Sequence, residues 1–173
     1  MSMKPLILGN IISLIAAFFI LSILFLLGIY GLDFAFNNIT KILMWIVWIF
    51  AFPAYVEYRK SSLKASYLIN YLPPIAILIT FIGLVLLMEG KFLGLETIVL
   101  GYILEPISGI SIYLSIKDIQ KFSAYLFFYG AVIYTIGLPF YLINIPEIAI
   151  IGDSIKIIGL SYFIKFMIKN SYQ

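Results

Sequence analysis

The segment FLGLETIVLGYILEPISGISIYLSI, residues 92–116, decides the fold. A helix rises about 1.5 Å per residue, and about 20 residues are enough to cross the hydrocarbon core of a bilayer. The segment is therefore predicted to be a transmembrane helix. Glu105 follows Leu93 by about 18 Å along its axis, which places a carboxylate close to the middle of the bilayer.

Five further apolar runs accompany this one. The chain has 173 residues, of which 64% are hydrophobic and 11% charged, whereas soluble domains are about half apolar and about a quarter charged. The runs are continuous rather than alternating, which favours helices over barrel strands. We therefore predict an all-α integral membrane protein: a single transmembrane domain, residues 1–173, of six helices with short loops. The expected helices are 6–31, 39–58, 66–88, 92–116, 122–144 and 147–168.

The basic residues predict the orientation of the helices. Because cytoplasmic loops are enriched in Lys and Arg, the more basic side is expected to be inside. The alternation puts both termini in the cytoplasm and predicts a multi-pass protein of the cell membrane. The basic side holds Lys4, Arg59, Lys60, Lys64, Lys117, Lys121, Lys165 and Lys169; the other holds Lys41, Lys91, Asp33, Glu89, Glu96 and Glu147.

Several classes of chemistry are disfavoured by composition. The chain has no Cys and no His, which removes disulfides, thiolate nucleophiles and imidazole metal ligands. Its net charge of +3 is too small and dispersed to indicate nucleic-acid binding. No glycine-rich phosphate loop or Asp-rich metal motif can be identified. Asp153 and Glu105 could meet and hold a metal ion, but Lys156 would compete with the cation. We therefore expect no enzyme, no cofactor and no metal site, with the lipid bilayer as the constant partner.

Three ionisable residues lie deep in the predicted helices: Glu105, Asp153 and Lys156. An unpaired charge at the bilayer centre costs at least about 2.5–3.5 kcal/mol, so each should face protein or water, or be neutralised. Lys156 is expected about 12 Å down a helix that runs in the same direction as 92–116. Asp153 precedes it by three residues, on nearly the same face. We predict that Glu105 pairs with Lys156.

Small residues flank both charges. Gly101 and Gly109 share a helix face with Glu105, and Gly152 and Gly159 flank Lys156. Small residues on one stripe allow close helix approach in membranes. We therefore predict that the fourth and sixth helices pack directly against each other. In the alternative, residues 144–156 form an outer loop and leave Asp153 and Lys156 in water.

Two functions are consistent with this pattern. The absence of motifs and the minimal loops favour a non-catalytic subunit that packs in a larger membrane assembly or against its own copies. The alternative is a small transporter or solute-binding unit that uses Glu105, Lys156 and Asp153. A buried ion pair can also serve only to specify helix packing. A cavity that reaches Glu105 would favour the second function.

Overall fold

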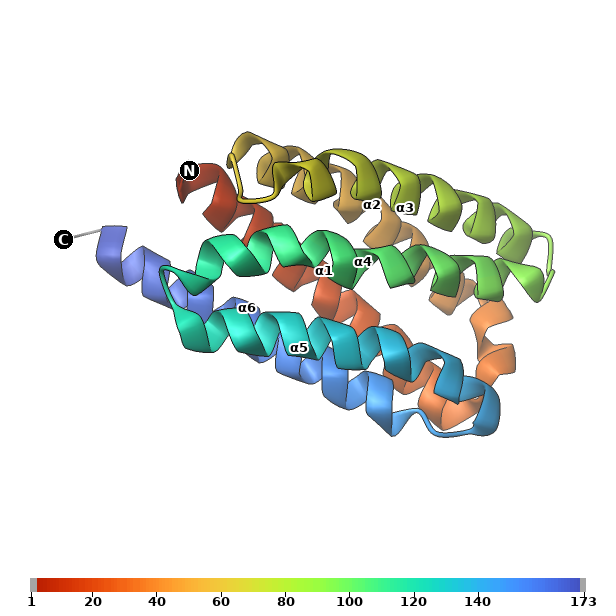
Figure 1. Cartoon of the computed structure of the whole chain (residues 1–173). Helices are drawn as coiled ribbons and strands as arrows, with labels where there is room; N and C mark the ends of the chain where they lie inside the picture. Colours follow the sequence, from red (N-terminus) through yellow and green to blue (C-terminus); the bar gives the residue numbers. More distant parts are fainter. Residues whose placement is uncertain (1–2, 172–173) are drawn as a thin grey trace.

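The computed structural model describes residues 3–171, which form six long α-helices and two short 3-10 helices, without a strand in that range. Figure 1 shows the helices as one elongated bundle. In chain order the elements are α1 (Met3–Tyr30), η1 (Leu32–Phe36), α2 (Asn38–Lys60), α3 (Ser66–Met88), α4 (Leu93–Lys117), α5 (Lys121–Gly137), η2 (Leu138–Ile143) and α6 (Glu147–Ser171).

The all-helical prediction is confirmed for these residues, and the helix ends differ from the predicted ones mostly by three residues or fewer. The largest difference is at the fifth helix, which ends at Gly137 instead of continuing to residue 144. Pro139 lies at the start of η2 and has no backbone N–H to continue the α-helical pattern. The chain therefore tightens into a 3-10 helix, and Asn144 follows with a left-handed φ of 59°.

Local sequence explains where the helices begin and end. Asn37 precedes α2, and its side-chain oxygen accepts a hydrogen bond of 2.9 Å from the backbone N–H of Ile39. This is the expected role of an Asn at a helix N-terminus. After α3, Gly90 adopts a φ of +77°, and the N–H of Lys91 bonds to the carbonyl of Leu86 at 3.0 Å. Glycine takes this conformation without steric penalty, so the chain can reverse there.

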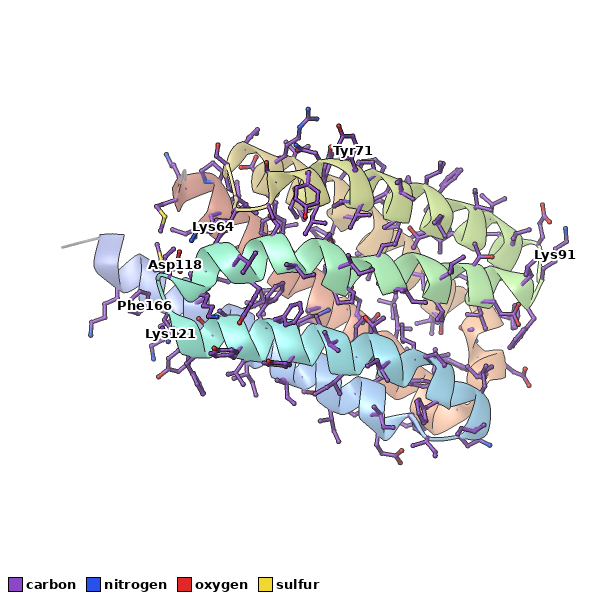
Figure 2. All side chains as sticks on the ribbon, viewed as in Figure 1. Lys64, Tyr71, Lys91, Asp118, Lys121 and Phe166 are labelled. Carbon is purple, nitrogen blue, oxygen red and sulfur yellow. The ribbon has the colours of Figure 1, made fainter. Side chains whose placement is uncertain are left out.

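The six helices form a closed ring in chain order. Each of α1 to α5 packs mainly against its neighbours in sequence, and α6 packs against α5 and α1. Both ends of the described chain lie at the same end of the bundle (Figure 1). Figure 2 shows Lys64, Asp118 and Lys121 at that end and Lys91 at the opposite end. The loops therefore separate into two groups, as the predicted alternation requires.

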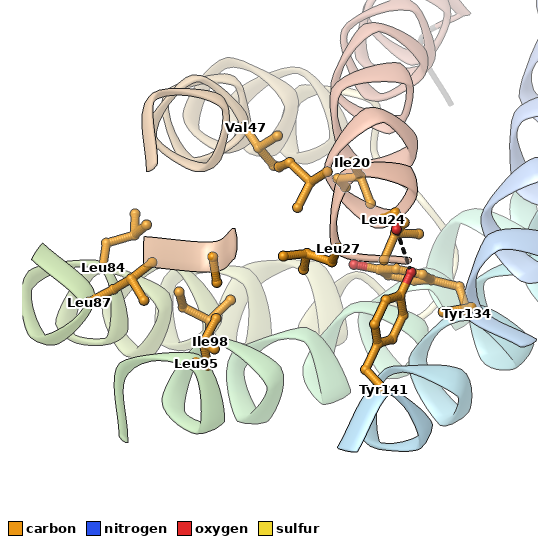
Figure 3. Packing of buried hydrophobic residues seen from close by; sticks show 13 residues of the cluster. Ile20, Leu24, Leu27, Val47, Leu84, Leu87, Leu95, Ile98, Tyr134 and Tyr141 are labelled. Atoms are coloured by element: carbon orange, nitrogen blue, oxygen red, sulfur yellow. Dashed lines mark hydrogen bonds between the residues drawn. The ribbon is translucent and has the colours of Figure 1, made fainter. Parts of the chain in front are cut away.

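Buried side chains inside the ring join the helices. One cluster includes Ile20 and Leu24 from α1, Val47 from α2, and Leu84 and Leu87 from α3. Figure 3 shows Tyr141 pointing at α1, where its hydroxyl donates a 2.8 Å hydrogen bond to the carbonyl of Leu24. A buried hydroxyl needs a hydrogen-bond partner, and this bond joins η2 to α1.

Five helical segments are long and apolar enough to cross a membrane: α1, α2, α3, α4 and the stretch Lys121–Ile143. These are compatible with a multi-pass membrane protein. The sixth predicted span, α6, does not belong to this group. Every stretch of 18 residues in α6 contains at least three charged residues, which reflects Asp153 and Lys156 in its interior. Whether α6 crosses therefore depends on where those charges lie.

Candidate functional site

The structure brings together the three deep charges singled out by the sequence. Lys156 Nζ lies 2.9 Å from Asp153 Oδ1 and 3.2 Å from Glu105 Oε1. Asp153 and Lys156 are one helical turn apart on α6, while Glu105 lies on α4. Lys156 Nζ also lies 4.6 Å from the ring centre of Tyr134 on α5, a cation–π distance.

The three side chains differ in exposure. The side chain of Asp153 is 0% exposed and that of Lys156 3%, whereas that of Glu105 is 37% exposed. The alternative that placed residues 144–156 in an outer loop is therefore wrong, because Asp153 and Lys156 belong to α6 and their side chains are buried. Neither carboxylate oxygen of Asp153 has a hydrogen-bond partner among the described residues, so its close contact with Lys156 is an ion pair that is not aligned as a hydrogen bond.

The cluster has one negative charge too many. Two carboxylates surround one ammonium group, so the fully ionised cluster carries a net charge of −1. In a low-dielectric environment an excess charge is expensive unless it is protonated, hydrated or paired. Asp153 is sealed and held by Lys156. Glu105 is the one member with open space beside it, so the excess charge is accessible there.

The predicted direct packing of α4 on α6 is wrong. The described helix α4 packs mainly on α3 and α5, and α6 on α5 and α1. A side chain added at Gly101 would meet Thr80 of α3, and one at Gly109 would first meet the ring of Phe127 on α5, 3.7 Å away. Side chains at Gly152 and Gly159 would overlap the backbone of α5 at Tyr134 and Phe127.

Lys156 reaches Glu105 although α4 and α6 do not pack against each other, because the lysine side chain is long. The backbone of Lys156 lies against Gly130 of α5, where an added Cβ would overlap it. This glycine lets α5 and α6 approach so closely that the flexible lysine stem can extend past α5 toward α4. Gly101, Gly152 and Gly159 therefore mark tight interfaces, as the stripes predicted, whereas Gly109 has room for a Cβ. A stripe of small residues does not say which helix will pack against it.

A cavity of about 500 Å³ lies beside the cluster and is lined by residues of all six helices. Most of the lining is aliphatic or aromatic, including Trp48 and Tyr58 of α2 and Tyr102 of α4. On α2 the lining extends from Met44 to Tyr58, which corresponds to roughly 21 Å along the axis. Glu105 and Lys156 both belong to the lining, so the charge cluster is part of its wall.

Within residues 3–171, two acidic residues and one basic residue line the cavity. The acids are Glu96, near the start of α4, and Glu105; within residues 3–171, Lys156 is the single basic residue of the lining. Lys156 is already engaged by two carboxylates and a ring. The cavity therefore offers negative charge to a molecule inside it and little positive charge.

The sequence did not reveal the cavity or the part that α2 has in it. In the sequence of α2 there is no glycine, and aromatic residues follow one another at Trp45, Trp48 and Tyr55. Large rings hold neighbouring backbones apart, and this contrast with the glycine-rich helices is the sequence signal of the cavity wall. Trp48 itself bridges to α3, since its indole Nε1 donates to the carbonyl of Ile77 at 3.0 Å.

Comparison with known proteins yields no match to this chain, whether with protein-family models, curated proteins or solved structures.

Proposed function

We propose that the protein is a solute-binding membrane protein whose ligand is a hydrophobic molecule held in the central cavity beside Glu105. The observation that carries this proposal is that a cavity of about 500 Å³ reaches a partly exposed carboxylate at the middle of the bundle. Protein interiors are close-packed, with few voids larger than a water molecule. The volume of this cavity lies within the range of small-molecule binding sites, about 300–1,000 Å³.

The lining favours an apolar occupant. Because the walls are mostly aliphatic and aromatic, water would find few hydrogen-bond partners there. A hydrophobic solute would gain dispersion contacts with the rings that line the cavity.

In this proposal all six helices cross the cell membrane. The outward side chains include many large apolar ones, such as Ile29 at 71%, Tyr71 at 70% and Ile143 at 62% exposure. Lipid would cover them. The charges of α6 do not oppose insertion, because Asp153 and Lys156 are buried inside the bundle. The orientation keeps the basic loops and both termini in the cytoplasm. A cysteine replacing Lys64 should then react with an impermeant thiol reagent only from inside, and one replacing Glu89 from outside.

The subunit role favoured by sequence alone stays a prediction. It requires no internal cavity, and packing against a partner would use the outer helix faces. A binding role accounts for both the cavity and the position of Glu105, so we prefer it. Transport would need a second conformation and is not part of the proposal.

Tryptophan fluorescence offers a direct test, because the chain has two Trp residues and Trp48 lines the cavity. Bromobenzene quenches indole fluorescence on contact. Purified protein in lipid nanodiscs should show a saturable quenching component as bromobenzene is added. Trp48→Phe should remove most of that component and leave the linear quenching that bromobenzene dissolved in lipid produces at Trp45.

A matched pair of variants on α2 controls for partition into lipid. Ala51 lines the cavity, whereas Val56 is 42% exposed and does not. Ala51→Phe should fill part of the cavity and abolish saturable quenching, while Val56→Phe should preserve it. Linear quenching in the unmodified protein, with no difference between the two variants, would remove the case for a solute site.

A further inference from the structure

We infer that the solute is a hydrophobic monocation, such as an amine or a quaternary ammonium ion, whose positive charge lies against Glu105. This inference rests on the proposed function and adds the chemical class of the ligand. The observations behind it are the excess negative charge of the cluster, the engagement of Lys156 and the aromatic lining.

Charge balance gives the first argument. With Asp153 and Lys156 paired, Glu105 supplies the uncompensated charge of the cluster. A bound cation would bring the site to neutrality, whereas a neutral solute would leave a carboxylate facing an apolar space. Desolvating an ion without a partner is costly, so neutralisation favours the cation.

An anionic solute fits the site poorly. The positive charge closest to Glu105 is Lys156 Nζ, which is 3% exposed and lies between Asp153 and Glu105. It already contacts both carboxylates and the ring of Tyr134, which leaves little of it available to an anion. Glu96 adds a second carboxylate to the wall, so an anion would meet repulsion both in the middle of α4 and near its start.

The aromatic residues give an independent argument. Rings of Trp48, Tyr58, Tyr102, Phe127 and Tyr134 line the same cavity. Aromatic faces attract cations through their quadrupoles, and combined rings and carboxylates are how proteins commonly hold quaternary ammonium groups. The site already shows this chemistry once, at the contact of Lys156 with Tyr134. A ligand cation would find further rings in the same lining.

The shape of the cavity limits the size of the ligand. Its volume of about 500 Å³ falls within the range of small-molecule sites, about 300–1,000 Å³. Its lining extends on both sides of Glu105 along the bundle axis, from Leu142 and Phe92 at one end to Ile69 at the other. The charged group should therefore lie in the middle of the cavity with apolar parts of the ligand around it.

Three probes of the same shape test this inference: benzyltrimethylammonium, the neutral neopentylbenzene and the anion benzylsulfonate. Their affinities are measured by displacement of bromobenzene from Trp48 in nanodiscs of zwitterionic lipid. The cation should bind about tenfold or more tightly than the anion, a difference of about 1.4 kcal/mol. Glu105→Gln should weaken the cation about tenfold and leave the neutral probe unchanged or tighter.

Two variants make the result specific to the carboxylate. Glu105→Asp retains the charge and should retain the preference for the cation. Glu89→Gln removes a charge at the far end of α3, outside the cavity lining, and should change none of the three affinities. Glu105→Gln leaves the Lys156–Asp153 pair in place, so it is expected to fold.

The outcomes separate this inference from the proposed function. If neopentylbenzene binds saturably but Glu105→Gln weakens all probes alike, or the cation has no advantage over the anion, the cavity binds solutes and the monocation inference is overturned. If none of the probes displaces bromobenzene and bromobenzene itself does not saturate, both proposals fail. A preference for the neutral probe over the cation would also contradict the inference.

Discussion

The hairpin of α5 and α6 and the seam between α2 and α3 are built in opposite ways. Gly130, Gly137, Gly152 and Gly159 bring the backbones of α5 and α6 so close that an added Cβ at any of them would overlap the other helix. The helix α2 has no glycine, and it meets α3 through rings such as Trp48 and Phe81, whose centres are 5.3 Å apart. The two interfaces therefore differ in both closeness and type of contact.

The share of buried residues also differs between these two regions. In the most apolar stretch of each segment, 39% of residues are buried for Lys121–Ile143, but 17% for α2 and for α3. The tight hairpin holds the sealed Asp153–Lys156 pair, while the looser seam forms part of the cavity wall. We conclude that the closely packed hairpin of α5 and α6 positions the charges, and that the seam between α2 and α3 leaves room for a solute.

The largest expected effect comes from Lys156→Met. This change leaves Asp153 buried without its cation, and breaking a buried ion pair from one side costs about 3–5 kcal/mol, less if Asp153 becomes protonated. Glu105→Gln should cost much less, because Lys156 keeps Asp153. Thermal unfolding in nanodiscs measures both variants.

A double variant tests the cause of the Lys156→Met defect. Adding Asp153→Asn should recover much of the lost stability, whereas adding Glu105→Gln should recover little, since Asp153 would still be stranded. Equal recovery by the two would mean that Glu105 and Asp153 contribute alike, contrary to their different exposure.

Gly152→Ala should have the next largest effect. The new methyl group would overlap the backbone at Tyr134, and overpacking of this kind typically costs about 1–3 kcal/mol. Gly109→Ala is the matched control: its nearest neighbour would be the Phe127 ring at 3.7 Å, an ordinary contact. That variant should be neutral or slightly more stable, because Ala is the better helix former. Equal melting temperatures for the two would break the distinction between the interfaces.

A smaller effect is expected at the seam. Trp48→Phe removes the hydrogen bond to the carbonyl of Ile77 and should cost about 0.5–1.5 kcal/mol. Trp45→Phe, on the same helix, removes an indole that makes no hydrogen bond within the described part of the chain. Its loss of stability should be smaller. A larger loss for Trp45→Phe would show that ring packing, and not this bond, holds α2 to α3.

The smallest effect concerns the Lys64–Asp118 ion pair, in which both side chains are 60% exposed. The ammonium of Lys64 lowers the pKa of Asp118 below its ordinary 3.8. The stabilisation is therefore present above pH 3.8 and lost as the pH falls through the lower folded-state pKa. Asp118→Asn should barely change stability at neutral pH, as is usual for surface pairs, and should flatten its decline below about pH 4. If the loss of stability at low pH is unchanged in this variant, other acidic residues cause it.

The sequence predicted the helices well because apolar run length is a local property. It also placed Glu105 and Lys156 at compatible depths, since depth follows from counting residues along a helix. It failed on which helices touch. Gly101 and Gly152 each indicated a close interface, but the partners, α3 and α5, depend on the ring order of the bundle, which no local pattern encodes.

The cavity was equally beyond prediction from the sequence. It exists because α2 presents Trp48, Tyr55 and Tyr58 to a space that α3 and α4 do not fill. The size of such a space depends on the volumes of many side chains and on how far apart the backbones lie. The short helix η2 was missed for a simpler reason: Pro139 lies inside the predicted helix 122–144, and α5 ends just before it.

Crystals grown in lipid and soaked in bromobenzene give the most direct test of the central claim, that the cavity beside Glu105 holds a solute. Anomalous scattering locates the bromine without reference to any functional assay. We predict one strong peak inside the ring of helices, among Trp48, Tyr102 and Glu105, and its loss in crystals of Ala51→Phe. Bromine found only on the outer surface, for example beside the exposed Ile107, would contradict the account.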